Sequence, residues 1–474
     1  MTASRKILAV DFGSTYTKVA LFDLDDAKLI GSAYTPSSVE TDVNVGLQVA
    51  LEELTSACGI APQRTGTPAV ACSSAAGGLK VVVIGLVPSL SLEAARRAAL
   101  GAGAKITGAF GHKLIASDLA GIVAGRPDIV LLAGGTDGGD ETTITANAAL
   151  LAVDGPHCPL IVAGNRNATA MCVETLKRGG KTVFEAPNIL PQIDRLDVNP
   201  VHNVIRDLFM HHITRAKGID RARSVLRLED EIVPTPRAIL EAAELLCSGP
   251  QRDGLGELVV VDIGGATTDV HSVASGVPTG SRIIKGLPEP YAKRTVEGDL
   301  GLRVNAPTIY ERVGEQALRD YMKRTASGAV DGFSIGLAAY CEFLSVHPAY
   351  APTNAHEKSI DLALARAAAS IAMQRHAGAV HDVMTASGPV AVQEGKDLSN
   401  VATVIGVGGV LAHGDDPAFV LNGTLTGIAA PTSLGPTAAR FYVDRSYVLF
   451  GVGLLAKRFP GEAFRIAMNY LTPI

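Results

Sequence analysis

The sequence predicts an α/β protein made of two related halves, with a doubly wound parallel α/β domain inserted into the first half. Two observations predict this fold. A short glycine-containing motif occurs twice, each time between two apolar strands, and strand-like and helix-like segments alternate between the two copies. The length of 474 residues corresponds to about three domains.

The repeated motif covers residues 11–19 and 262–270, which share an Asp, a Gly, a Thr and a final Val. Apolar strands are expected on both sides of each copy, over 6–10, 19–22, 258–261 and 270–273. Each copy is therefore expected to form a β-hairpin with a glycine turn. The shared residues in a shared context favour the duplication of a domain.

The segment between the two copies alternates apolar runs with helical patterns. Strands are expected over 80–85, 105–110, 128–134, 159–163 and 182–186. Helices are expected over 91–103, 113–125, 141–153 and 167–179, with Ser91 and Asn167 as N-caps and Gly103, Gly125 and Gly179 as helix ends. This alternation predicts an inserted parallel domain at about 68–190.

The remaining ranges complete the expected organisation. Residues 1–67 are expected to begin the first half, and 191–250 to complete it with a helix at 238–247. The second half is expected over 251–440, mostly helical between about 278 and 400, with a strand at 404–410. A C-terminal helix is expected within 441–474, from about Tyr447.

The composition excludes several classes of function. The net charge is −5, from 42 basic and 47 acidic residues, so no basic surface is expected to attract nucleic acid. Six scattered cysteines without a CxxC pair indicate a reducing compartment, and a cytoplasmic location is expected. Asp11 interrupts the apolar N-terminal run, and no stretch has the ~18 apolar residues of a membrane span. Aromatic residues make up 5%, with no Trp, which disfavours a stacking platform.

The first glycine turn has the groups that a phosphate site needs. Gly13 lacks a side chain, so a phosphate can approach the main chain there. Further donors come from the side chains of Ser14, Thr15, Thr17 and Lys18. Asp11, at the end of the strand, is suited to hold Mg²⁺ with its waters. A tight hairpin turn without a ligand is the alternative for either copy alone.

The second glycine turn repeats these parts, and a third glycine loop follows later in the chain. The second turn contains Asp262, Gly264, Gly265, Thr267, Thr268 and Asp269. The third loop contains Gly406, Gly408 and Gly409 after an apolar strand, which leaves bare backbone against which an adenosine could lie. Two facing turns of this kind could hold one polyphosphate between two domains.

The order of these three elements, with a second turn of the type Asp-x-Gly-Gly-x-Thr-x-Asp, resembles the actin-like ATPase superfamily. That superfamily includes sugar kinases, heat-shock ATPases and actin. The resemblance implies duplicated RNase H-like domains with a nucleotide in the cleft. Residues 232–249 and 444–453 are similar to the two connecting helices of the superfamily.

A narrower resemblance covers nearly the whole chain. It is to the glutamate mutase accessory protein family, called MutL or GlmL, and rests on residues 72–80, 84–88, 98–105, 132–139 and 262–273. It implies a role beside adenosylcobalamin-dependent carbon-skeleton mutase subunits, as a reactivating ATPase. The role of the glycine loop at 134–139 stays open, between a crossover turn and a second binding site.

The resemblance also implies roles for individual residues. The first phosphate site would consist of Asp11, Gly13, Ser14, Thr15, Thr17 and Lys18, and the second of Gly264, Gly265, Ala266, Thr267 and Thr268. Asp262 and Asp269 would organise Mg²⁺ and the attacking water, with Asp11 and Asp262 closest to the metal. Gly406, Gly408 and Gly409 would form the adenosine loop. Ala266 departs from the superfamily, where many members have a third Gly.

These observations predict an ATP- and Mg²⁺-dependent reactivating factor of a glutamate mutase type enzyme, with slow ATPase activity controlled by domain closure. Three alternatives remain open: a small-molecule kinase of the same fold, an activator ATPase of an acyl-CoA dehydratase, and an actin-like scaffold. A homo-oligomer is compatible with each of them.

Overall fold

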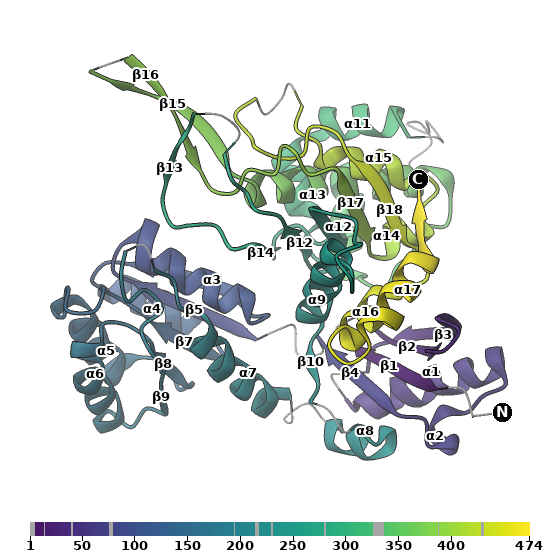
Figure 1. Ribbon diagram of the computed structural model, residues 1–474, viewed down its shortest axis with the longest axis horizontal. Helices are drawn as coiled ribbons and strands as arrows, with labels where there is room; N and C mark the ends of the chain where they lie inside the picture. The colour runs from purple at the N-terminus through teal and green to yellow at the C-terminus, as the bar shows by residue number, and fades with distance from the viewer. Residues whose placement is uncertain are drawn as a thin grey trace. The chain divides into compact units, whose positions relative to one another are not determined.

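The computed structural model describes residues 5–13, 15–38, 41–74, 79–193, 195–213, 218–228, 231–278, 281–325, 336–386, 388–427 and 431–474. The chain forms two compact units. Unit 1 contains Met1–Ser74, Lys217–Lys285 and Glu289–Ile474, and unit 2 contains Ala75–Ala216 and Gly286–Pro288 (Figure 1). Among the described residues, no helix combines the length and the apolar character that a membrane crossing requires.

The first sheet of unit 1 has the strand order β10-β4-β1-β2-β3. Strands β1, β2 and β3 are antiparallel neighbours, whereas β4 and β10 run parallel to β1. The strands are β1 Lys6–Phe12, β2 Tyr16–Asp23, β3 Lys28–Pro36, β4 Ala69–Ser73 and β10 Val233–Pro234. The helices of this half are α1 Val43–Cys58, α2 Pro62–Thr65, α8 Ile219–Leu226 and α9 Thr235–Ser248.

The second sheet repeats this arrangement, in the order β14-β12-β11-β17-β18-β19. Here β11, β12 and β14 are antiparallel neighbours, and β17 and β18 run parallel to β11. The strands are β11 Leu258–Ile263, β12 Thr268–Val273, β14 Ala292–Glu297, β17 Thr403–Val407, β18 Arg440–Asp444 and β19 Leu471–Pro473. The predicted duplication is confirmed, because both glycine motifs occupy the same hairpin of equivalent sheets.

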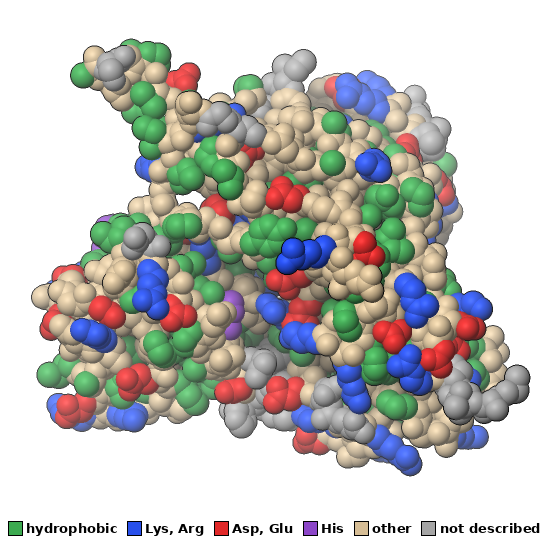
Figure 2. Space-filling view, in the orientation of Figure 1, with side chains coloured by type: hydrophobic (Ala, Val, Ile, Leu, Met, Phe, Trp, Pro, Cys, Tyr) green, Lys and Arg blue, Asp and Glu red, His purple; other side chains and the backbone are tan. Residues whose placement is uncertain are grey.

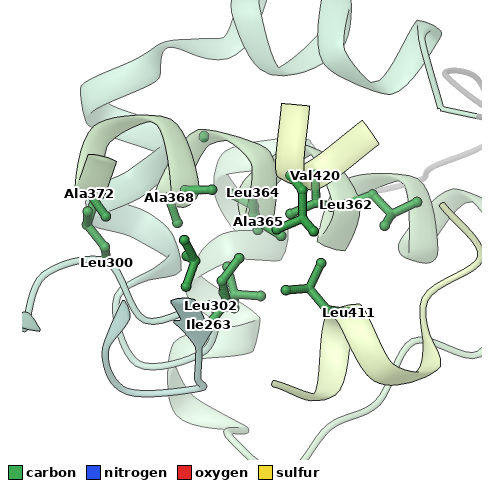
Figure 3. Packing of buried hydrophobic residues seen from close by; sticks show 14 of the residues in the cluster. Ile263, Leu300, Leu302, Leu362, Leu364, Ala365, Ala368, Ala372, Leu411 and Val420 are labelled. Atoms are coloured by element: carbon green, nitrogen blue, oxygen red, sulfur yellow. The ribbon is translucent and has the colours of Figure 1, made fainter. Parts of the chain in front are cut away.

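Helices cover the second sheet and enclose a large apolar core. Figure 3 shows alanines and leucines of α13 packed against Ile263 and Leu302, and these residues are buried. The alanine-rich sequence of α13 allows this close approach of helix to sheet. The helices are α10 Ala306–Val313, α11 Glu315–Lys323, α12 Leu337–Val346, α13 Ala355–His376, α14 Gly409–His413, α15 Pro417–Leu421 and η2 Asn422–Thr424.

Two helices join the halves of unit 1, as expected for connecting helices. One core cluster contains residues of β1, β11, α9 and α16 (Leu449–Leu455) together, and α17 (Pro460–Tyr470) packs beside them. A Cβ at Gly453 would collide with the carbonyl of Ala238, and one at Gly451 would lie 2.6 Å from the Phe22 ring. The glycines of α16 therefore permit close contact with α9 and with the first sheet.

The expectation of a mostly helical region between 278 and 400 is wrong in part. This region also contains β14 and a small sheet of β13 Ile283–Lys285, β16 Gly388–Glu394 and β15 Ala379–Thr385. The hairpin of β15 and β16 projects from the second half in Figure 1, and hydrophobic side chains are visible on it in Figure 2. The exposed apolar residues of this small sheet are Ile283, Ile284, Val383 and Met384.

Unit 2 is a parallel sheet of the order β6-β5-β7-β8-β9, which is a doubly wound topology. Its strands are β5 Lys80–Gly85, β6 Lys105–Gly111, β7 Ile129–Leu132, β8 Leu160–Val162 and β9 Val183–Glu185. Its helices are η1 Pro88–Leu92, α3 Glu93–Gly101, α4 Ala116–Ala124, α5 Thr142–Asp154, α6 Arg166–Arg178 and α7 Asn199–Ile213. The predicted fold class is therefore confirmed.

Several local predictions about the ends of helices in unit 2 were wrong. Ser91 is not an N-cap, because its hydroxyl accepts from the N–H groups of Leu86 and Val87 within a π-helical turn. Asn165, rather than Asn167, caps α6. Gly125 and Gly179 do end their helices, whereas α3 ends at Gly101, before Gly103. The compact unit follows β4 in the chain and includes α7.

Candidate functional site

The two glycine turns of unit 1 face each other. One joins β1 to β2 and the other joins β11 to β12, at equivalent places in the two sheets. A Cβ at Gly265 would lie only 4.0 Å from Thr15 Oγ1, so the second turn lies directly beside the first. Ser14, a predicted member of the first turn, lies outside the described residues.

Asp11 is a buried carboxylate held from three sides. The Thr235 hydroxyl donates a hydrogen bond of 2.6 Å to Oδ1, and the Cys72 thiol lies 3.5 Å from the same oxygen. The Lys18 ammonium lies 3.6 Å from Oδ2. Burial, followed by the charge of Asp11, raises the pKa of the Cys72 thiol, so this thiol stays protonated. Asp11 is thus fixed in position before any ligand is considered.

Asp262 lies among other carboxylates. Burial, followed by the charge of Asp269, raises the pKa of Asp262 to about 6. Asp11 and Asp444 raise this pKa too, whereas Lys18 lowers it. The site therefore concentrates more negative charge than Lys18 alone balances, and a cation would relieve that excess.

Asp269, unlike Asp262, has its charge balanced by a neighbouring arginine. Arg294 donates to Asp269 Oδ1 through Nε at 3.1 Å and Nη2 at 2.7 Å. The Thr267 hydroxyl donates to Oδ2 at 3.0 Å. Both oxygens are thus occupied, and Asp269 holds Thr267 in place on the second turn.

The glycines of the turns keep the backbone bare. Gly13 N–H donates to Tyr16 O at 3.0 Å, and Gly264 N–H donates to Thr267 O at 2.9 Å, so the two turns have the same internal bond. A Cβ at Gly13 would collide with Tyr16 O. Any larger residue at Gly13 would therefore distort the first turn.

Two predicted phosphate donors, Thr17 and Thr268, point into the protein interior. Thr17 is fully buried, and its hydroxyl lies 3.3 Å from where a Cβ of Gly46 in α1 would be, on the opposite side of β2 from Lys18. The Thr268 hydroxyl donates to Leu300 O at 2.7 Å inside the core. Both side chains therefore point away from the side of the hairpins that Lys18 occupies. Ala266 packs its backbone against Gly301.

The third glycine loop has three distinct glycines. Gly406 is buried in β17, where a Cβ would lie 2.8 Å from Leu411. Gly408 has φ of 109° and its backbone lies against the carbonyl of Ile263, at the end of β11. Gly409 is exposed beneath the hydroxyl of Tyr447. Only Gly408 and Gly409 therefore lie next to the second turn or at the surface.

Several residues of the site were missed by the sequence reasoning, because they are remote in sequence from the glycine motifs. They are Cys72, Thr235, Arg294, Asp444 and Tyr447. Asp444 lies five residues before the first residue of α16 and holds the start of that helix. Its carboxylate accepts from the N–H groups of Val448 and Leu449 at 2.9 and 2.8 Å.

The donor set of the site suits magnesium rather than a transition metal. Within the described ranges, no group of three or more His, Cys, Asp or Glu side chains is arranged to hold a metal ion. Mg²⁺ usually takes only one or two carboxylates and keeps its other positions for waters and phosphates. Asp11 and Asp262 are two carboxylates of this site, so the number and kind of the side chains present fit Mg²⁺.

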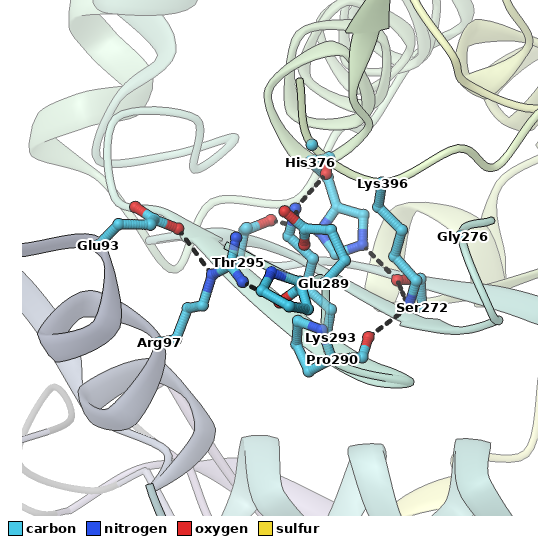
Figure 4. Close-up of polar contacts among 12 residues, drawn as sticks. Glu93, Arg97, Ser272, Gly276, Glu289, Pro290, Lys293, Thr295, His376 and Lys396 are labelled. Atoms are coloured by element: carbon cyan, nitrogen blue, oxygen red, sulfur yellow. Dashed lines mark hydrogen bonds and ion pairs between the residues drawn. The ribbon is translucent and has the colours of Figure 1, made fainter. Parts of the chain in front are cut away.

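A buried polar network anchors the strand that follows the second turn. The ring of His376 lies 2.8 Å from the hydroxyls of Ser272 and Thr295 through its two nitrogens (Figure 4). The Lys396 ammonium donates to Ser272 and to the carbonyls of Pro290 and Tyr291. Burial lowers the pKa of Lys396 to about 7. This network fixes β12 and β14, and with them Asp269 and Arg294.

The glycine loop after β7 in unit 2 is held from within. Asn165 donates to the carbonyls of Gly139 and Asp140 and accepts from Gly138 N–H. Asn188 donates to Gly135 O and to Asp137 Oδ1. These bonds favour a structural crossover turn for this loop.

Comparisons with known proteins were consistent with one family. The family model of the MutL protein matches residues 7–471. The MutL protein of Clostridium tetanomorphum is 40% identical over 469 residues, which are 98% of this chain and 99% of that protein. Among solved structures, nucleotide-free acetone carboxylase aligns at 12% identity over 96% of this chain and 70% of its own, with a TM-score of 0.43. A nucleotide-free diol dehydratase-reactivating factor aligns at 12% identity over 96% of this chain and 100% of its own, with a TM-score of 0.36.

Proposed function

The chain belongs to the MutL protein family, and from that premise and the geometry of the turns we propose that it binds Mg-ATP between the halves of unit 1. We further propose that it serves as an accessory, reactivating ATPase of an adenosylcobalamin-dependent carbon-skeleton mutase of the glutamate mutase type. The observation that carries the nucleotide assignment is the second turn lying beside the first, with Asp11, Asp262 and Lys18 around them.

Each group has a role in this proposal. The Thr15 hydroxyl and the backbone of Gly265 would bind phosphate oxygens, and Gly13 and Gly264, whose N–H groups bond within their own turns, would leave room for them by lacking side chains. Lys18 would add a point charge to the same phosphates. Mg²⁺, when bound, supplies charge neutralisation for the polyphosphate, and Asp11 and Asp262 are the residues that would hold it.

Asp262 is the better candidate to orient an attacking water, because both oxygens of Asp269 are already engaged. A carboxyl group with a pKa of about 6 is also close to the range in which it can exchange a proton at neutral pH. Slow hydrolysis follows, since no second free base accompanies it among the described residues of the turns. The two halves of unit 1 would then move relative to each other when ATP binds and is hydrolysed.

Binding and reactivation test the proposal separately. Isothermal titration of the purified chain with ATP, with and without Mg²⁺, is expected to give Mg²⁺-dependent binding. The chain with Mg-ATP is expected to restore an inactivated glutamate mutase, whereas the chain with a non-hydrolysable analogue is not. Binding without reactivation of any carbon-skeleton mutase would contradict the accessory role and leave the nucleotide site intact.

A matched pair of aspartate variants tests the site. Asp262→Ala is expected to reduce Mg²⁺-dependent ATP hydrolysis by at least tenfold, because it removes a metal ligand and the carboxylate beside the attacking water. Asp382→Ala removes an exposed carboxylate on the β15–β16 hairpin and serves as the control. Equal hydrolysis by the two variants would exclude Asp262 from the metal site.

A further inference from the structure

Four rings gather beside the glycine turns: Tyr16, Tyr34, His413 and Tyr447. Tyr34 lies 5.9 Å from Tyr16, 6.1 Å from His413 and 6.2 Å from Tyr447, measured between ring centroids. His413 and Tyr447 are 5.6 Å apart. Tyr16 and Tyr34 belong to the first sheet, whereas His413 and Tyr447 follow strands of the second sheet. This ring cluster therefore joins the two halves of unit 1.

Tyr447 is held in an unusual backbone conformation within the ring cluster. Its φ of 51° lies in the left-handed region, which a residue with a side chain adopts only when its surroundings compensate the strain. Asp444 caps the helix that begins just after it, and the Tyr447 hydroxyl lies 3.4 Å from where a Cβ of Gly409 would be. The ring thus has a fixed position next to the third glycine loop.

Lys18 meets Tyr447 across this junction. The Lys18 ammonium lies 4.9 Å from the centroid of the Tyr447 ring, and 3.6 Å from Asp11 Oδ2. The charge of Lys18 also acts on Asp262. Lys18 therefore lies between an aromatic face of the second half and the carboxylates of the site.

We propose that Tyr447 is a positioning residue for Lys18. The ring attracts the ammonium by a cation–π interaction and holds it in a loose pair, 3.6 Å from Asp11 Oδ2, instead of a close ion pair with the carboxylates. In that position the charge is available to a phosphate oxygen between the turns, a step that rests on the proposed function. A ligand that draws Lys18 away from the ring also loosens a contact between the two halves of unit 1.

The matched variants are Tyr447→Phe, which keeps the ring, and Tyr447→Leu, which removes it. The control is Tyr321→Leu, which removes a ring lying 5.5 Å from the Arg366 guanidinium, a contact of the same kind within α11 and α13. Tyr447→Leu is expected to raise the KM for Mg-ATP by about three- to thirty-fold, the range of a cation–π contact, with kcat changed less than about two-fold. Tyr447→Phe is expected to recover most of this loss, and Tyr321→Leu to leave both constants unchanged.

A second measurement does not depend on ATP. Acetic anhydride labelling, followed peptide by peptide, reports how available the Lys18 amine is, with exposed Lys457 as the internal reference. Tyr447→Leu is expected to slow labelling of Lys18 by at least three-fold, because the ammonium then forms a closer ion pair with Asp11 than the 3.6 Å contact that it has beside the ring. Tyr447→Phe is expected to label like the wild type.

The results separate this inference from the proposed function. If the wild type fails to bind Mg-ATP, the proposed function is wrong, and labelling of Lys18 still decides the role of Tyr447. If Tyr447→Leu and Tyr447→Phe behave alike in labelling, Tyr447 does not position Lys18. A KM effect of Tyr447→Leu that persists in a Lys18→Met background would overturn the inference too, since the ring would then act without the lysine.

Discussion

Replacing Asp262 by Asn is expected to stabilise the protein while it removes Mg²⁺-dependent activity. The carboxyl group of Asp262 lies among the charges of Asp269, Asp11 and Asp444. An amide has the same shape but carries no charge, so the cost of burying a charge and the repulsion from the neighbouring carboxylates both disappear. A residue that costs stability in the absence of a cation and is needed for function in its presence is typical of a metal site.

The magnitude follows from the pKa. An unperturbed aspartate has a pKa of 3.8, whereas Asp262 has a pKa of about 6. At about 1.4 kcal/mol per pKa unit, ionising Asp262 costs the folded state on the order of 3 kcal/mol. For a unit of this size each kcal/mol moves the unfolding temperature by roughly 1–2 °C, so a gain of ~3–6 °C is expected at pH 7.5.

The raised pKa of Asp262 also determines how the stability difference between the variant and the wild type changes with pH. Below pH ~4 the carboxyl group is protonated in the folded and unfolded states alike, so the Asp262→Asn variant and the wild type are expected to be equally stable. Between pH ~4 and ~6 the unfolded state releases its proton first, and the wild type loses stability relative to the variant. Above pH ~6 the difference is constant.

Differential scanning calorimetry between pH 4 and 8 measures the difference in unfolding temperature between the variant and the wild type. The method needs no Trp fluorescence, and this chain has no Trp. Millimolar Mg²⁺ is expected to reduce the difference in unfolding temperature at pH 7.5, because it stabilises only the wild type. Asp382→Asn, on the exposed hairpin, is the control and is expected to show no gap at any pH. An Asp262→Asn variant that is no more stable than the wild type at pH 7.5 would refute the reasoning about clustered carboxylates.

Three further predictions concern the support of the site. Gly453→Ala is expected to lower stability by more than about 2 kcal/mol in calorimetry, because a Cβ there collides with a carbonyl of α9, whereas Gly461→Ala meets open space and is the control. Thr235→Val removes the 2.6 Å hydrogen bond to Asp11 and is expected to weaken Mg-ATP binding by about five- to thirty-fold in titration calorimetry, with the fold retained. Burial lowers the pKa of His271 to about 3, so the protein is expected to lose up to about 1.4 kcal/mol of stability per pH unit as the pH falls from ~6.5 to ~3. This loss is expected to be smaller in His271→Leu. An unchanged dependence of stability on pH in the variant would exclude this histidine as the cause.

The sequence was sufficient for the parts of the fold that depend on local pattern. A strand, a glycine turn and a second strand recur at two places, and each hairpin is a local structure, so both sheets could be anticipated from it. The sequence pattern places strand β4 in the inserted domain instead, although it pairs with β1 from Leu8–Ala69 to Phe12–Ser73. A buried parallel strand has the same apolar pattern in any sheet, so its partner is determined by contacts remote in sequence.

The site was predictable only where the turns themselves supply the groups. Thr17 and Thr268 were expected to bind phosphate because they are hydroxyls in the motif, but strand alternation turns them towards the core. Arg294 and Tyr447 join the site from other elements, which no spacing within the motif indicates. The low aromatic content also gave no sign that four rings converge beside the turns.

The duplication and its divergence at one position account for the chemistry of the site. Lys18 faces Asp11 across the first hairpin, and Asp269 faces Asp262 at the equivalent place in the second. In the first hairpin the carboxylate is balanced by its cross-strand partner, whereas in the second two carboxylates oppose each other and Arg294 balances only Asp269. Burial is the main cause that raises the pKa of Asp262 to about 6, and the facing charge of Asp269 raises it further. One repeated shape thus yields a first turn whose two charges balance, with a lysine available to phosphate, and a second turn with an excess negative charge that a metal ion would neutralise, and the proposed Mg-ATP site needs both.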